Sequence, residues 1–329
     1  MHVPDGFIDT KTAAVTAGLA VAGVAWAAQR VHRTLPPRKV PLLGLTAAFV
    51  FAAQMLNFPV AGGTSGHLLG GVLAAVLVGP SAGVLVLTSV LIVQCLLFAD
   101  GGLLALGANI FNMGILGTAG AYGIYWLLRR KARGVRGLLM ASAFASWCSV
   151  VLASSACAAQ LAFSGTARWG IVFPAMTAVH ILIGFGEALI TTLVLAAIAT
   201  TRPDLLPEET RRSAAPQFTG VIVYGMLITA GLAFFIAPFA SPWPDGLERV
   251  GENLGFLEQA AEPPLAAAPL PDYAIPGIGS PVVATALAGG LGTVVMFIFA
   301  FFLARLLTPR SAAATDLHTD SQDHAPRLP

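Results

Sequence analysis

Residues 172–200 read VFPAMTAVHILIGFGEALITTLVLAAIAT, an apolar run broken by one imidazole, His180, and one carboxylate, Glu187. A helix that crosses a bilayer needs about 20 mostly apolar residues, and this run exceeds that length. The whole chain has the same character, because 56% of its 329 residues are hydrophobic and only 10% are charged. Soluble domains carry roughly 25% charged residues. The composition therefore predicts a polytopic membrane protein and excludes an ordinary soluble enzyme.

Further apolar runs lie on both sides of this one. They predict an all-α membrane protein with about nine transmembrane helices, seven in a first unit and two in a second. The predicted spans are 12–31, 41–57, 67–80, 82–98, 103–128, 138–162, 172–200, 217–239 and 281–307.

The basic residues predict the orientation of these spans, because cytoplasmic loops of membrane proteins are enriched in lysine and arginine. An N-terminus on the outside places 15 of the 18 basic residues on the cytoplasmic side. They are Arg30, Arg33, Arg38, Lys39, Arg129, Arg130, Lys131, Arg133, Arg136, Arg202, Arg211, Arg212, Arg305, Arg310 and Arg327. The N-terminus and the segment around His67 then share the outer face.

The chain divides into two membrane parts. Residues 1–205 are expected to form the seven-helix unit, residues 206–216 a cytoplasmic linker, and residues 217–310 the two-helix part. An extracellular loop, about 240–280, separates the last two helices and carries six acidic residues against one basic residue. This loop could concentrate cations, or it could be a solvated spacer. The polar tail, 311–329, is predicted to be disordered.

Some functions are excluded by what the sequence lacks. None of its lysines follows a glycine, so it has no phosphate-binding loop and is not expected to hydrolyse ATP. The net charge of +2 indicates no nucleic-acid partner. We therefore expect neither an enzyme nor a catalytic cofactor.

His2 places an imidazole beside the terminal amine of Met1. A metal ion could take the amine, the deprotonated amide nitrogen of His2 and its imidazole nitrogen. A fourth nitrogen would complete the plane that Ni(II) and Cu(II) favour and that Co(II) can adopt. His67 ends a glycine-rich segment on the same predicted face and could supply it. From these residues alone, His2 could equally be an arbitrary outer residue, and His67 could merely hydrogen-bond a carbonyl.

The first part contains five long motifs of unusual composition. They are MHVPDGF (1–7), NFPVAGGTSGH (57–67), QCLLFADGG (94–102), NIFNMG (109–114) and HILIGFGE (180–187). Together they resemble the substrate-binding membrane component of energy-coupling-factor (ECF) cobalt/nickel transporters. The resemblance implies that Met1, His2 and His67 bind the metal, with Ni2+ or Co2+ as transported substrate. It also implies a place in the bacterial cell membrane, beside a transmembrane coupling protein and cytoplasmic ATPase subunits.

The second part contains PWPDGLERV at residues 242–250, which resembles the two-helix accessory subunit of the same transporters, here fused. The resemblance implies a contact that helps to load or open the metal site. A metal-selective secondary transporter or channel is the alternative function. It would need a polar path and an ion-coupling site, and only His180 and Glu187, seven residues apart on one helix face, point to one. These two residues could instead form a hydrogen-bonded structural pair.

Overall fold

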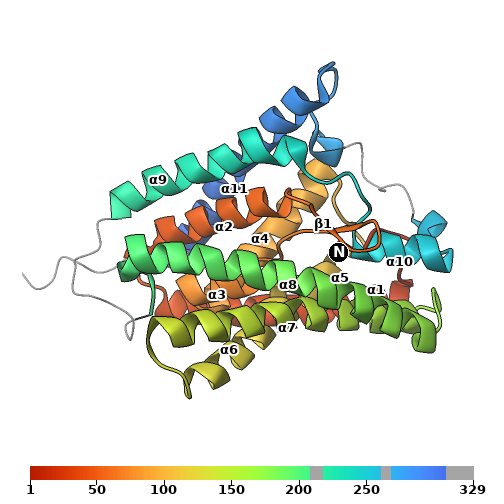
Figure 1. The fold of residues 1–329 in the computed structure, drawn as a ribbon, viewed down its shortest axis with the longest axis horizontal. Coiled ribbons are helices and arrows are strands. Elements are labelled where there is room, and N and C mark those ends of the chain that lie inside the picture. Colours follow the sequence, from red (N-terminus) through yellow and green to blue (C-terminus); the bar gives the residue numbers. More distant parts are fainter. Residues whose placement is uncertain (208–217, 261–267, 309–329) are drawn as a thin grey trace, which may run out of the picture.

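The computed structural model describes residues 1–207, 218–260 and 268–308, most of which are helical (Figure 1). The helices of the first part are α1 (Thr10–Thr34), α2 (Val40–Gln54), α3 (Gly71–Val78), α4 (Pro80–Phe98), α5 (Leu106–Asn109), α6 (Ala121–Arg129), α7 (Gly134–Phe163) and α8 (Trp169–Thr201). The second part contributes α9 (Phe218–Gly231), α10 (Gly246–Leu254) and α11 (Pro281–Leu307). Two short strands, β1 (Phe58–Val60) and β2 (Thr64–Gly66), pair antiparallel.

Six helices of the described residues are long and apolar enough to cross a membrane. They are α1, α4, α7, α8, α11 and the segment Thr219–Phe239, which includes most of α9. The all-α polytopic fold is therefore confirmed.

Helices lie in all nine predicted ranges, but not all of them are full spans. The third range, 67–80, is wrong as a span, because α3 has eight residues and rises about 12 Å, against a hydrocarbon core of about 30 Å. Gly70 and Gly79 flank α3 with φ angles of +78° and +96°, which break the helix at both ends. The second range holds α2, which has 15 residues, and the fifth is filled by α5, a π-helical segment (Ile110–Gly120) and α6 in succession.

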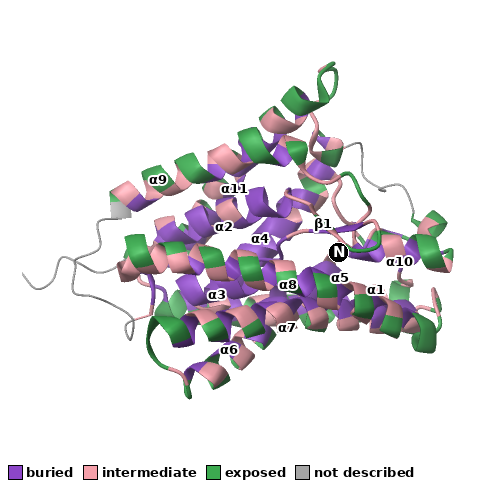
Figure 2. Cartoon of the chain, viewed as in Figure 1, coloured by how far each residue is buried: buried purple, intermediate pink, exposed green. Residues whose placement is uncertain are grey.

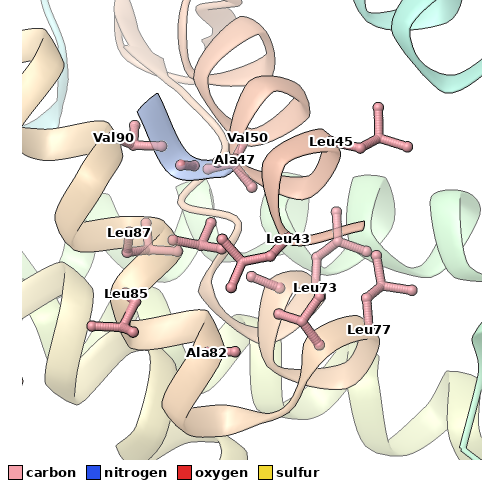
Figure 3. Close-up of a cluster of buried hydrophobic side chains, with 14 of the residues drawn as sticks. Leu43, Leu45, Ala47, Val50, Leu73, Leu77, Ala82, Leu85, Leu87 and Val90 are labelled. Carbon is pink, nitrogen blue, oxygen red and sulfur yellow. The ribbon is translucent and has the colours of Figure 1, made fainter. Parts of the chain in front are cut away.

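The buried core lies between α2, α3 and α4, whose apolar side chains meet in the centre of the bundle (Figure 3). Leu43, Leu73 and Leu87, one from each helix, are at most 1% exposed. Figure 2 shows that α2, α3 and α4 are mostly buried, whereas α1, α8 and α9 have exposed faces. These faces carry large apolar residues such as Leu189 and Leu193, which suits contact with lipid.

Glycines let the second part pack closely on the first, with α9 and α11 beside α2 (Figure 1). A Cβ atom on Gly44 of α2 would lie 3.1 Å from the carbonyl oxygen of Phe297 in α11. A Cβ atom on Gly292 of α11 would lie 2.5 Å from the ring of Phe51 in α2. Small residues permit such close approach of membrane helices.

The two ends of the bundle differ in what they carry (Figure 1). The N-terminus, β1 and α10 lie at one end, whereas α8 finishes and α9 begins at the other. The predicted linker, 206–216, lies outside the described residues after residue 207, and so does the whole predicted tail, 311–329. The predicted loop 240–280 contains α10, which brings the second part to the N-terminal end of the first.

Candidate metal centre

Residues 1–5 are anchored by hydrogen bonds of both their backbone and their side chains. The amide of Val3 donates to the Asn109 side-chain oxygen at 2.8 Å, and the Asn109 amide donates back to the Val3 carbonyl at 3.1 Å. The buried carboxylate of Asp5 accepts hydrogen bonds from the backbone amides of residues 103–105 at 2.9–3.1 Å. This anchoring fixes where the chain begins, and hence where the terminal amine lies.

The terminal amine of Met1 lies between His67 and Asp245. Its nitrogen is 2.8 Å from Nε2 of His67 and forms an ion pair with Oδ2 of Asp245. Two nitrogens bound at about 2.0 Å to one ion, at right angles to each other, lie about 2.8 Å apart. The 2.8 Å contact is a hydrogen bond from the ammonium to Nε2, and its length equals the separation of neighbouring ligands in a planar site.

The segment around His67 is positioned by its turn and by a buried carboxylate. Gly62 and Gly63 adopt φ angles of +80° and +70° and turn the chain from β1 into β2. Glu187 of α8 accepts hydrogen bonds from the amides of residues 69 and 70 at 2.5 and 2.9 Å. Nδ1 of His67 lies 3.0 Å from the Leu68 carbonyl, which can only accept. Nδ1 therefore carries the proton, and Nε2 presents its lone pair to the amine.

His2 is nearby, but its ring is held by other partners. Its imidazole stacks on that of His67 with ring centroids 5.3 Å apart. Nδ1 of His2 lies 3.1 Å from Asp100, and Nε2 lies 3.2 Å from the side-chain oxygen Oε1 of Gln94. Tyr273, from the second part, donates to the other oxygen of Asp100 at 2.5 Å. Among the described residues, none accepts a hydrogen bond from the His2 backbone amide.

The electrostatics of this end keep both imidazoles neutral. Burial, helped by the neighbouring ammonium and His2, lowers the pKa of His67 to about 3. Burial also lowers the pKa of His2, although Asp100 opposes the shift. For Asp245, burial favours the neutral acid, but the ammonium of Met1 outweighs it and holds the pKa of the carboxyl below its ordinary value. A neutral imidazole has the free lone pair that a metal ion needs.

The second part docks directly on the His67 segment. Ser65 of β2 donates from its amide to the Pro244 carbonyl at 2.8 Å and from its hydroxyl to the Trp243 carbonyl at 2.7 Å. Arg249 donates to the carbonyl of Gly63. Helix α10 buries Leu247 and Val250 against the bundle. Residues 243–245 and α10 are docked on the bundle, so the interpretation of the acidic loop as a solvated spacer is wrong for this stretch.

A small cavity of about 20 Å³ lies at the contact between the two parts. Met1, His67, His180, Asp245 and Gly246 contribute to its lining. Its size suits one water molecule or one small ion.

His180 and Glu187 do not form the hydrogen-bonded pair considered from the sequence. Glu187 accepts from the backbone of residues 69 and 70, and Nδ1 of His180 lies 2.7 Å from the Met176 carbonyl. Glu187 thus supports the segment that carries His67.

The structure brings together the three residues predicted as ligands, Met1, His2 and His67. Within the described residues, no group of three or more His, Cys, Asp or Glu side chains could hold a metal ion.

Sequence reasoning assigned no role to Asp245, Asp100 or Gln94, although all three lie in the quoted motifs. Asp245 could have been found as a helix N-cap, because Glu248 follows it three residues later in the pattern of a capping box. Its contact with Met1 joins residues 244 positions apart, and no local pattern encodes such a contact.

Two protein families match the chain in succession. Residues 2–205 match the family described as "Cobalt uptake substrate-specific transmembrane region", and residues 219–309 match the PDGLE domain. Residues 206–218 separate the two matches.

Similar proteins carry names that refer to metal transport. A putative fused nickel transport protein from Archaeoglobus fulgidus is 36% identical over 307 residues, which cover 93% of this chain and 98% of the relative. A fused nickel transport protein from Rhodobacter capsulatus is 34% identical over 66% of this chain and 67% of its own length. A crystal structure titled as a truncated transition metal transporter is 33% identical with a TM-score of 0.55, over 61% of this chain and 99% of that structure.

Proposed function

This chain belongs to the family of cobalt uptake substrate-specific transmembrane regions and acts in transition-metal uptake, and we propose that Met1, His2 and His67 hold the ion. The ligands would be the terminal amine, the deprotonated amide and Nδ1 of His2, and Nε2 of His67. The transported substrate is nickel or cobalt, and the ion is cargo rather than a catalytic cofactor.

The observation that carries this proposal is the 2.8 Å separation between the Met1 amine and Nε2 of His67. The two groups come from segments 66 residues apart in the sequence, and each segment is anchored separately, through Asp5 and through Glu187. Nitrogen ligands in a plane favour Ni(II) and allow Co(II). The same ligands disfavour Mg(II) and Ca(II), which prefer oxygen.

Loading of the ion would fix the proton of the His2 ring on one nitrogen. Nδ1 of His2 faces Asp100 and Nε2 faces Oε1 of Gln94, and both partners can accept, so the neutral ring can carry its proton on either nitrogen. Binding through Nδ1 would place the proton on Nε2 and free Asp100 from the ring. Gln94 suits both states, because its amide group can donate to Nε2 or accept from it.

The energy for uptake would come from other chains. The sequence has no phosphate-binding loop, so a transmembrane coupling protein and cytoplasmic ATPase subunits of an energy-coupling-factor transporter would drive import. In this arrangement the chain lies in the cell membrane with its N-terminus outside. Residues 1–205 would form the metal-binding unit, and residues 217–310 the fused accessory part.

Binding and uptake test the two levels of the proposal separately. The purified chain with an unextended N-terminus should bind Ni(II) tightly, and His67→Ala should lose that binding while His32→Ala keeps it. His32 is an exposed residue of α1 whose Nδ1 lies 2.7 Å from the Leu307 carbonyl, outside the candidate site. In vesicles, uptake should require ATP and the partner chains. Uptake by the chain alone, without ATP, would instead favour a channel or secondary transporter.

A further inference from the structure

Asp245 is the residue of the second part that reaches the terminal amine. Met1 is 6% exposed and Asp245 is 16% exposed, so the ion pair is largely screened from water. The two oxygens of Asp245 have separate partners. Oδ1 accepts from the amides of Leu247 and Glu248 at 2.7 and 2.9 Å, whereas Oδ2 contacts the amine.

Several contacts fix the position of the Asp245 carboxylate. Asp245 caps α10, and Glu248 returns a hydrogen bond by accepting from the Asp245 amide at 2.9 Å. The preceding residues 243 and 244 are bonded to Ser65 through their carbonyl groups. A Cβ atom on Gly246 would lie 2.7 Å from the ring of His180, so the backbone sits directly against α8. Oδ2 is therefore fixed relative to the amine.

The charge of this pair matches the charge of a loaded site. Without metal, the ammonium and the Asp245 carboxylate cancel. With metal, the ion adds two positive charges, the amine is neutral and the His2 amide carries one negative charge. One positive charge remains, and the Asp245 carboxylate balances it. The summed charge of the amine, the His2 amide, Asp245 and the ion is therefore the same with and without metal. Loading thus avoids the large cost of leaving a charge unpaired in a buried place.

Asp245 can also keep its hydrogen bond during loading. An amine bound to a metal still carries N–H groups, and Oδ2 can accept from one of them. Such a bond orients the ligand and raises its basicity, as carboxylates do for metal-bound histidines. Asp100, the other nearby carboxylate, faces the ring of His2 and not the amine.

We propose that Asp245 is a positioning residue for the metal, which holds the terminal amine in place and balances the charge of the loaded ion without binding it. This inference rests on the proposed function, since it assumes that the amine is a ligand. It assigns the fused accessory part a direct share in the metal site.

The test compares Asp245→Asn with the parent chain and with Glu258→Gln. Asparagine caps helices about as well as aspartate, so Asp245→Asn removes the charge and keeps the start of α10. Glu258 is an exposed acidic residue of the same part, and its change to glutamine alters the net charge equally. Ni(II) affinity is measured by chelator competition, and the visible absorption band of bound Ni(II) is recorded at saturation.

We expect Asp245→Asn to bind Ni(II) about 10- to 100-fold more weakly, with an unchanged absorption band, since the ligands are the same. Glu258→Gln should match the parent, and Asp245→Glu, which keeps the charge, should fall between parent and Asp245→Asn. Affinity within threefold of the parent for Asp245→Asn would overturn the inference. A shifted band would also overturn it, because Asp245 would then be a ligand itself. Failure of the proposed function looks different, because the parent would lack tight binding or His67→Ala would retain it.

Discussion

Extending the N-terminus by two residues, Gly-Ser, should abolish tight metal binding. The extension turns the Met1 nitrogen from an amine into an amide, which removes its positive charge and its lone pair. There is no room beside Met1 for the two added residues, because Met1 is 6% exposed and the adjoining cavity measures about 20 Å³. Asp245 would lose its ion-pair partner while remaining largely buried.

The magnitude follows from the loss of a metal ligand. Losing a group that only orients a ligand costs about 10- to 100-fold in metal affinity, so losing the amine itself should lower Ni(II) affinity by at least about 100-fold. The assay is isothermal titration in detergent or nanodiscs, with chelator competition for the parent. The control carries the same two residues after Pro329, at the far end of the chain. An N-terminally extended protein that binds within threefold of the parent would refute the role of the amine.

Three further predictions concern the ligands, the pH dependence and the contact between the parts. His67→Ala should bind Ni(II) at least about 100-fold more weakly, whereas His32→Ala should bind like the parent; equal binding by the two variants would contradict the ligand assignment. The pKa of His67 is lowered to about 3, so its ring is neutral between pH 5.5 and 8 and releases no proton on loading. The ammonium and one amide do release protons, so Ni(II) affinity should rise with pH by up to about two decades per unit, and a flat titration would exclude them as ligands. Gly246→Ala places a Cβ atom 2.7 Å from the ring of His180 and should weaken Ni(II) binding by undocking α10, whereas Gly220→Ala, with no atom within 4 Å, should not; equal affinities would show that this contact does not support the site.

The spans were predictable where apolar length alone decides the structure. The run 172–200 became α8, because such a run is favourable only across a bilayer or in a large core. The run 67–80 has similar composition, yet most of it does not form a spanning helix. Its helix is limited by Gly70 and Gly79, whose positive φ angles end it on both sides. Hydropathy does not register that difference.

The site was predictable only in part, for a related reason. His2 and His67 could be identified because chelation by a terminal amine and adjacent imidazole depends on position in the sequence. Asp245 and Asp100 take their roles from contacts across the fold, with Met1 and with the ring of His2. The prediction for the acidic loop rested on its charge. Its buried Leu247 and its capping residues instead make part of it a docked helix.

The ligand set itself is tested most directly by X-ray absorption at the nickel edge, on the protein with its native N-terminus and one bound Ni(II). We expect a planar first shell made of nitrogen alone. The outer-shell scattering should correspond to two imidazole rings in the parent and to one ring in His67→Ala. A six-coordinate shell dominated by oxygen, unchanged in His67→Ala, would contradict the assignment of Met1, His2 and His67 as the residues that hold the metal.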